Sequence, residues 1–260
     1  MDLALEGKTV LVTGGASGIG EAIVRGLAGE GAIPVIVDRD RAQGLRVREE
    51  VSATSVECGL VEADLGEPGA CRSAVEAAAG VTGRIHGLVN NAGVNDGVSL
   101  EDGDPDAFLF SLRRNLLHYF EMAHLTLPYL KEGRGSIVNV SSKVAVTGQG
   151  GTSGYAASKG GILALTREWA VDLLPHGIRV NAVIPAEVMT PQYGQWIQGF
   201  ADPDEKLDEI VRKIPLDQRM TTPDEIADTV LFLLSDRASH MTGQHLVVDG
   251  GYIHLDRAKP

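Results

Sequence analysis

The sequence predicts an α/β domain in which a parallel sheet of about seven strands carries helices on both faces. Three observations support this fold class. Short β-branched runs alternate with longer amphipathic stretches, most of these runs are apolar on both faces, and no repeat or linker interrupts the 260 residues. Such alternation is typical of a doubly wound sheet with right-handed crossovers. We therefore expect a single domain over residues 1–260.

The expected elements recur along the whole chain. Helices are expected between the strands, for example at Gly20–Gly29 and Thr222–Ser235. In the second of these, Thr222 is suited to cap the helix, Pro223 to occupy its first position, and Glu225 to complement its dipole. The expected strands are Thr9–Thr13, Val35–Asp38, Ser55–Leu60, Leu88–Asn90, Ser136–Val140, Arg179–Val183 and Leu246–Val248.

Residues 187–215 break the alternation of strands and helices. This segment carries Tyr193, Trp196 and Phe200 together with several glutamines, and it holds no clear strand. An insertion of this length in an α/β domain often serves as a functional lid. We expect a substrate lid here; the alternative is a surface helical excursion that only packs.

Composition excludes several classes of protein. Lys and Arg number 23 and Asp and Glu 35, so the net charge is −12, which argues against nucleic acid and anionic membranes as partners. Two cysteines, Cys58 and Cys71, exclude a disulfide scaffold and favour a reducing compartment. No signal-peptide or membrane-span pattern is present, so we expect a cytoplasmic protein. The seven histidines lack ligand-like spacing, and no metal is expected.

A glycine-rich turn follows the first expected strand. The residues from Thr13 read TGGASGIG, with glycines at Gly14, Gly18 and Gly20, and a helix comes next. Glycines allow a tight turn and a close approach of the helix N-terminus to a pyrophosphate. A plain strand-to-helix turn would rarely need three glycines so arranged. The pattern predicts a Rossmann-type dinucleotide site.

The end of the second expected strand bears on the choice of dinucleotide. Asp38 lies there, twenty residues after Gly18, where a carboxylate accepts hydrogen bonds from the adenosine ribose and repels a 2′-phosphate. Ser17 stands in the glycine-rich turn, which holds no Lys or Arg. Both facts favour NAD over NADP. Arg39 keeps NADP open, because its side chain could turn toward a 2′-phosphate.

Tyr155 and Lys159 are spaced to share one face of a helix. A nearby ammonium favours the tyrosinate, which could take a hydroxyl proton while a hydride leaves the same carbon. This spacing alone recurs by chance, but its surroundings add weight. Ser142 ends an expected strand at the carboxyl edge, where doubly wound folds bind ligands. Asn115 lies within an expected helix, where a buried amide needs a backbone carbonyl or a water as partner.

At this point the chain resembles the short-chain dehydrogenase/reductase family over essentially its full length. The motifs TGGASGIG, Asp64-Leu65, NNAG, YAASK and the final VDGG occur in the family's order, as do Asn115 and Ser142. The resemblance implies that Tyr155 is the general base in oxidation and the acid in reduction. It further implies that Lys159 lowers the pKa of Tyr155 and holds the nicotinamide ribose, that Ser142 positions the substrate oxygen, and that Asn115 holds a relay water.

The resemblance also implies a set of cofactor residues and a homotetramer built on the helices around Asn115 and Tyr155. The family's usual Asn-Pro-Gly is changed here, because Ala186 and Glu187 follow Pro185. The implied cofactor contacts beyond that point require the backbone to accept Ala186. The cofactor residues are Gly14, Ser17, Gly18, Ile19, Gly20, Asp38, Asp64, Leu65, Asn91, Tyr155, Lys159, Val188 and Thr190.

Polar and flat aromatic side chains in the expected pocket segments suit a hydroxyl-rich substrate. We predict that the substrate contacts are Ser142, Asn95, Gln149, Glu187 and Trp196. The Asn-Asp-Gly after NNAGV and the PAEVMTP stretch look similar to bacterial L-fucose dehydrogenases of this family. That likeness implies NAD-dependent oxidation of the anomeric hydroxyl of a free sugar, such as L-fucose, to its lactone.

Two other functions stay open. A 3-oxoacyl thioester reductase, or another ketone reductase, uses the same scaffold and residues; the net charge of −12 and Asp38 count against it. A nucleotide-binding relative without catalysis belongs to a different class of protein. The presence of Asn115, Ser142, Tyr155 and Lys159 together argues against that second alternative.

Overall fold

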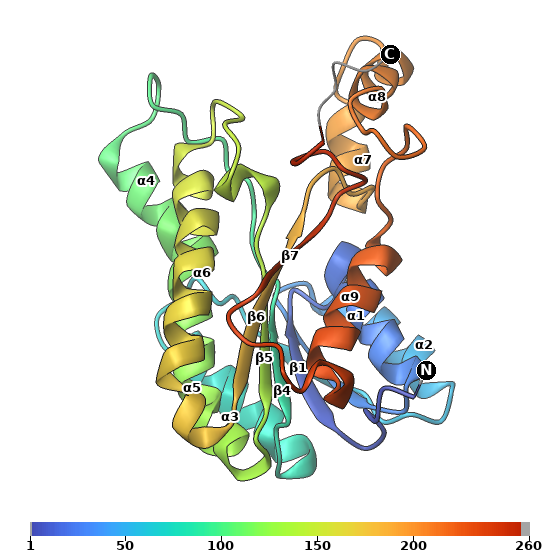
Figure 1. Ribbon diagram of the computed structural model, residues 1–260, viewed down its shortest axis with the longest axis vertical. Coiled ribbons are helices and arrows are strands. Elements are labelled where there is room, and N and C mark those ends of the chain that lie inside the picture. Colours follow the sequence, from blue (N-terminus) through green and yellow to red (C-terminus); the bar gives the residue numbers. More distant parts are fainter. Residues whose placement is uncertain (1, 256–260) are drawn as a thin grey trace.

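A computed structural model describes residues 2–255, and its centre is one sheet of seven parallel strands. The strand order is β3-β2-β1-β4-β5-β6-β7, so the chain reverses direction along the sheet between β1 and β4 (Figure 1). This order confirms the predicted doubly wound fold. The strands are β1 Thr9–Thr13, β2 Ile33–Asp38, β3 Gly59–Glu62, β4 Gly87–Asn90, β5 Ser136–Val140, β6 Arg179–Pro185 and β7 His245–Val248.

Helices cover both faces of the sheet. Figure 1 shows α3, α5 and α6 on one side and α1, α2 and α9 on the other, while α7 and α8 stand beyond the carboxyl ends of the strands. None of the helices within residues 2–255 combines the length and the apolar character needed to cross a membrane. The helices are α1 Gly18–Gly29, α2 Arg41–Ser52, α3 Ala70–Thr82, α4 Pro105–Leu112, α5 His118–Gly133, α6 Ser153–Asp172, α7 Pro191–Ile197, α8 Pro203–Val211 and α9 Pro223–Leu234.

Two apolar cores flank the sheet because successive strand residues point to opposite faces. On one face Val12 packs with Ile23 of α1 and Leu231 of α9. On the other, Leu88 and Ile137 pack with residues of α3, α5 and α6. Full burial of each such side chain contributes about 1.5–3 kcal/mol to stability. The sheet is therefore anchored on both sides, and its carboxyl edge is held rigidly in place.

The third strand differs from the prediction. It spans Gly59–Glu62 rather than Ser55–Leu60, and its register pairs Val35 with Gly59. Residues 53–55 form a turn after the end of α2, in which Ser55 adopts a positive φ of 68° and its N–H donates to the carbonyl oxygen of Ser52. A backbone closed into a turn by its own hydrogen bonds cannot pair with β2, so the strand begins four residues later.

The start of α9 agrees with the prediction made from the sequence. The hydroxyl of Thr222 accepts from the N–H of Glu225, and the Glu225 carboxylate accepts from the N–H of Thr222. This reciprocal pair is a capping box that satisfies two backbone donors with no helical partner. The helix runs from Pro223 to Leu234, one residue inside the predicted range at each end.

Candidate active site

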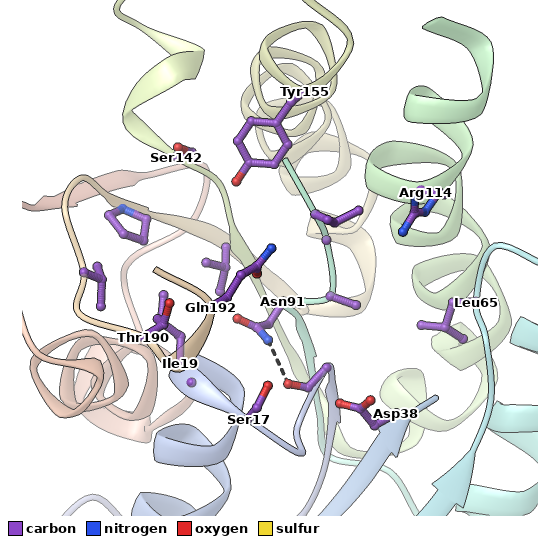
Figure 2. A pocket seen from close by; sticks show the side chains of 18 of the residues that line it. Ser17, Ile19, Asp38, Leu65, Asn91, Arg114, Ser142, Tyr155, Thr190 and Gln192 are labelled. Atoms are coloured by element: carbon purple, nitrogen blue, oxygen red, sulfur yellow. Dashed lines mark hydrogen bonds between the residues drawn. The ribbon is translucent and has the colours of Figure 1, made fainter. Parts of the chain in front are cut away.

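A cavity of about 430 Å³ opens at the carboxyl edge of the sheet. It is lined by the ends of β1, β2, β4, β5 and β6 and by residues of α6 and α7. Figure 2 shows Tyr155 and Ser142 toward one end of this space and Asp38 and Leu65 toward the other. An elongated cavity of this kind can hold a dinucleotide along its length, with the reacting atoms near Tyr155.

The glycine-rich turn forms the floor of the cavity. Gly14 and Gly18 have positive φ values of 66° and 55°, which residues with a Cβ seldom adopt. Gly20 does not line the cavity, because it packs on the turn itself: a Cβ there would lie 1.9 Å from the carbonyl oxygen of Gly14. Ser17 and Ile19 do line the cavity. The free N–H groups of the first turn of α1 can therefore receive an anion.

Acidic side chains mark the end of the cavity away from Tyr155. One carboxylate oxygen of Asp38 accepts from the N–H of Ala16 at 3.0 Å, and the other accepts from the N–H of Asp40 at 2.9 Å. Arg39 lies 3.9 Å from the carboxylate of Asp64, and both of these side chains are exposed. Arg39 thus has an acidic neighbour of its own at this end, although an exposed pair of this length stabilises the arrangement little.

Asn91 connects the glycine-rich turn to the neighbouring strand. Its side-chain amide donates to the carbonyl oxygen of Thr13 at 3.0 Å and to that of Gly14 at 3.2 Å. Its backbone N–H donates to the Thr13 hydroxyl at 2.9 Å. Asn91 lines the cavity (Figure 2), and so it shapes the phosphate-binding turn from the side where the resemblance places the nicotinamide ribose.

Tyr155 and Ser142 meet at the opposite end of the cavity. Tyr155 lies in the first turn of α6. Ser142 is the second residue after the end of β5. Burial raises the pKa of Tyr155 to about 12, a hydrogen bond with Ser142 lowers it, and the charge of Asp96 raises it. Before ligands bind, the low dielectric constant of this pocket thus keeps the phenol protonated.

Lys159 is 2% exposed, one turn beyond Tyr155. Its ammonium donates to the carbonyl oxygen of Val140 at 2.8 Å and to the hydroxyl of Tyr119 at 3.1 Å. The ammonium nitrogen lies 5.5 Å from the centroid of the Tyr155 ring. Burial lowers the pKa of Lys159 to about 7. Tyr155 and Lys159 therefore share one face of α6, as predicted. The carbonyl oxygen of Val140 at the end of β5 and the hydroxyl of Tyr119 hold the Lys159 ammonium.

Asn115 lies behind this pair, in a π-helical turn at Arg113–Leu117 between α4 and α5. Its side-chain amide donates to the carbonyl oxygen of Ser111 at 3.1 Å, and its side-chain oxygen accepts from the N–H of Val94 at 2.7 Å. The buried amide thus has the backbone carbonyl partner expected from the sequence. A Cβ on Gly93 would lie 3.0 Å from that side-chain oxygen and 3.5 Å from the Lys159 ammonium nitrogen, so this glycine lets the two side chains approach each other.

The segment after β6 accommodates Ala186 where the family usually has glycine. Val188 and Thr190 both line the cavity at the predicted positions. The hydroxyl of Thr190 caps α7 by accepting from the N–H of Tyr193 at 3.2 Å. A Cβ on Gly18 would lie 3.3 Å from Thr190, so the start of α7 reaches the glycine-rich turn.

Among the predicted substrate residues, Ser142 lines the cavity and the other four do not. Asn95 is exposed, and Gln149 lies in a second pocket with Lys143 and Tyr252. Glu187 is buried and already holds two partners, Lys143 and the hydroxyl of Tyr193. Trp196 is half-exposed and packs edge-on against Tyr193 and Phe200. The structure therefore brings only Ser142 of the five predicted substrate residues to the cavity.

The cavity also has walls that the predicted site did not include. Arg114 and His118 line it at the junction of α4 and α5, and Gln192 and Tyr193 of α7 line it from within the expected lid segment. The guanidinium of Arg114 lies 5.2 Å from the Phe110 ring centroid. The capping pattern of Thr190 with Pro191 could have pointed to α7. No local sequence signal marks Arg114 or His118, because the π-helical turn decides which way they face.

The residues present fit a nicotinamide dinucleotide. The open first turn of α1, the cradle of Gly14 and Gly18, and the carboxylate of Asp38 suit a pyrophosphate and an adenosine ribose in that order. Tyr155 and Ser142 then lie at the end where a nicotinamide ring reacts. Fold and site together define an oxidoreductase that uses a nicotinamide cofactor.

Comparison with known proteins gives the family. A family model described as enoyl-(acyl carrier protein) reductase matches residues 14–253. The L-fucose dehydrogenase of Mus musculus is 36% identical over 246 residues, which are 94% of this chain and 88% of the mouse protein. The chain belongs to the short-chain dehydrogenase/reductase family, and it acts on CH–OH groups with NAD or NADP.

Solved structures agree with this assignment. The chain in the crystal structure of Cj0485 dehydrogenase is 44% identical in sequence to this chain, with a TM-score of 0.94. The match covers 99% of this chain and 98% of that chain. The L-sorbose reductase of Gluconobacter frateurii, complexed with NADPH and L-sorbose, is 25% identical with a TM-score of 0.94 and covers 98% of this chain and 100% of its own. The predicted fold and family are thereby confirmed.

Proposed function

We propose that the protein oxidises the anomeric hydroxyl of a free sugar such as L-fucose to its lactone, with NAD as hydride acceptor. The observation that carries this proposal is the position of Tyr155 and Ser142 at the end of the cavity opposite Asp38. The resemblance to the mouse L-fucose dehydrogenase supports the substrate class.

The polarity around Tyr155 supports a substrate rich in hydroxyl groups. One carboxylate oxygen of Asp96 accepts from the hydroxyl of Ser111 at 2.8 Å. The other is buried and has no hydrogen-bond partner among residues 2–255, and the charge of Asp96 acts on Tyr155. A carboxylate oxygen without a partner is costly unless a donor reaches it. A sugar hydroxyl is such a donor, whereas an acyl chain is not. Because Asp96 does not line the cavity and this oxygen is buried, the segment around Asp96 has to move before a substrate reaches it.

In the proposed mechanism, each side chain has one task. Ser142 hydrogen-bonds the substrate oxygen and orients the carbon that reacts. Tyr155, as tyrosinate, removes the hydroxyl proton, and the Lys159 ammonium stabilises that negative charge. When bound, NAD supplies the hydride acceptor. Residues of α7 cover the cavity and limit the access of water, so the segment 187–215 acts as the lid.

The preference for NAD rests on charge. The carboxylate of Asp38 would repel a 2′-phosphate, and Arg39 has the Asp64 carboxylate as a neighbour. The NADPH bound to the L-sorbose reductase makes NADP the competing cofactor that any assay must include.

The proposal includes a homotetramer in the cytoplasm. Exposed apolar side chains support the assembly, because Leu109, Phe110 and Phe120 lie on α4 and α5, and Val171 lies at the end of α6. Both cysteines are free and buried, as expected in a reducing compartment. Sedimentation equilibrium of the purified protein tests the tetramer; a monomeric mass at micromolar concentration contradicts it.

A turnover assay tests the function directly. NADH and NADPH production would be followed with L-fucose, D-arabinose, L-galactose, L-rhamnose and D-glucose, and with sorbitol, which has no anomeric hydroxyl. We expect turnover with NAD that is confined to L-fucose and its stereochemical relatives. Equal turnover of sorbitol, or a preference for NADP, contradicts the proposal.

The second candidate is a 3-oxoacyl thioester reductase, which the 35% identity over 255 residues to the 3-oxoacyl-[acyl-carrier-protein] reductase of Thermotoga maritima favours. It predicts no sugar turnover and consumption of NADPH with a 3-oxoacyl thioester. A nucleotide-binding protein without catalysis predicts tight NADH binding and no turnover in either assay.

A further inference from the structure

Tyr119 is a fully buried tyrosine of α5 whose hydroxyl reaches the active-site lysine. Its oxygen lies 3.1 Å from the Lys159 ammonium nitrogen and 2.9 Å from the carbonyl oxygen of Val140. The ammonium nitrogen lies 2.8 Å from the same carbonyl oxygen. The three groups close a triangle of hydrogen bonds behind the cavity, on the side away from solvent.

The direction of each bond in this triangle is determined. The carbonyl oxygen of Val140 can only accept, so the phenol of Tyr119 donates its single proton there. The phenol oxygen must then accept from Lys159, because an ammonium only donates. Two of the three ammonium donors are thereby occupied, and the third is left for the cavity, which Lys159 lines.

Neighbouring titratable groups cannot take over this task. His118 lines the same wall, but burial lowers its pKa to about 4, so it is neutral. Its Nε2 bonds to the carbonyl oxygen of Arg114, and its Nδ1 makes no hydrogen bond to Lys159 or to any other residue in 2–255. Asp96 acts on Tyr155 and is held by Ser111. A phenylalanine in place of Tyr119 would leave one donor of a buried ammonium without an acceptor, which favours the neutral amine.

We propose that Tyr119 is a positioning residue whose hydroxyl orients the Lys159 ammonium toward the cofactor and Tyr155 and opposes the loss of its proton on burial. The inference rests on the proposed roles of Tyr155 and Lys159, and it does not depend on which sugar is oxidised. Its consequence has a definite sign. Loss of the acceptor lowers the pKa of Lys159, positive charge beside Tyr155 decreases, and the pKa of Tyr155 rises.

The test is an ultraviolet titration of tyrosinate in the complex with NAD, which needs no substrate. Tyr155→Phe identifies the step that belongs to Tyr155. In Tyr119→Phe we expect this step to move up by about one pH unit. The matched control is Thr126→Val, which removes a buried hydroxyl from the same helix that bonds only to Met122 and Ala123; there the step should stay in place.

Two results would overturn the inference. One is a Tyr155 step that stays within about 0.2 pH unit of the native value in Tyr119→Phe, which assigns Tyr119 to packing alone. The other is a titration in which Tyr155→Phe shows the same tyrosinate step as the native complex. The step then does not belong to Tyr155, and the inference loses its premise whatever the sugar assay shows. If Tyr119→Phe does not fold, 3-fluorotyrosine at position 119 weakens the acceptor without removing it. We then expect a smaller shift in the same direction. The absence of any shift would overturn the inference.

Discussion

The hydroxyl of Tyr193 donates a hydrogen bond of 2.6 Å to the carboxylate of Glu187. The other oxygen of this carboxylate pairs with Lys143, and both charged side chains are almost fully buried. The contact ties α7 to the loop after β6 and to the loop after β5. Burial, the hydrogen bond to Glu187 and the charge of Glu187 all raise the pKa of Tyr193, so the phenol stays a donor at every physiological pH.

Glu187→Ala should destabilise the protein strongly, because it leaves the buried Lys143 ammonium without its carboxylate partner, with the Tyr252 ring centroid 4.5 Å away. We expect a loss of about 3 kcal/mol in the free energy of unfolding, measured by urea denaturation. The control is Glu209→Ala, which breaks exposed pairs with Lys206 and Lys213. Although these pairs lower the pKa of Glu209 to about 2, solvent screens them, and no measurable change is expected. Equal effects of the two substitutions would contradict the assigned role of Glu187.

Tyr155→Phe should abolish turnover while NADH binding persists. Loss of a general base costs about 10²–10⁴-fold in rate, and the phenyl ring keeps the shape of the cavity. Turnover and the fluorescence of bound NADH would be measured on the same preparation. Tyr129→Phe on α5 is the control, because Tyr129 does not line the cavity. Retained turnover in Tyr155→Phe would remove Tyr155 from the mechanism.

The burial of Lys159 predicts how stability depends on pH. Its pKa is about 7 in the folded protein and about 10.4 in an unfolded chain. Between these values the unfolded state binds more protons, so the free energy of unfolding rises with pH, by about 1.4 kcal/mol per unit. Urea denaturation without cofactor at about pH 7.5 to 9, which lies between these two pKa values, should show this rise. In Lys159→Met this rise of the free energy of unfolding with pH should be missing. Parallel pH profiles for the native protein and Lys159→Met would contradict the assignment of the rise to Lys159.

Asp38→Asn should shift cofactor preference toward NADP. The amide oxygen can still accept from the N–H of Ala16, but the charge that repels a 2′-phosphate is gone. We expect the ratio of kcat/KM for NAD over that for NADP to fall by about 10-fold or more. Glu62→Gln on β3 is the control, since it removes the same charge from an exposed side chain outside the cavity. An unchanged ratio in Asp38→Asn would show that another group selects the cofactor.

Gly20→Ala should abolish cofactor binding, because the new Cβ would lie 1.9 Å from the carbonyl oxygen of Gly14 and the turn would have to open. Gly29→Ala, at the other end of α1, meets no atom within 4 Å and should stabilise the helix by about 0.5–1 kcal/mol. Isothermal titration with NADH and thermal unfolding would be run on both variants. Native affinity in Gly20→Ala would contradict the assigned packing of the turn.

Local patterns in the chain predicted much of the fold and part of the site. The apolar β-branched runs predicted six strands closely, and the capping pattern at Thr222 predicted the start of α9. The third strand was misplaced, because the turn at Ser55 closes on its own backbone and no periodicity marks that closure. Asn115 was expected in an ordinary helix, whereas it lies in a π-helical turn, where its side-chain oxygen accepts from the N–H of Val94.

The sequence by itself determined the sheet, the glycine-rich turn, Asp38 at the strand end, and Tyr155 and Lys159 on one helix face. These features depend on residues close together in the chain. Only the tertiary structure decided that Lys159 bonds to Tyr119, forty residues away, and that Glu187 is held by Lys143, forty-four residues away. Such contacts depend on how the helices pack on the sheet. They decide which buried charges have partners and which polar groups remain for a ligand.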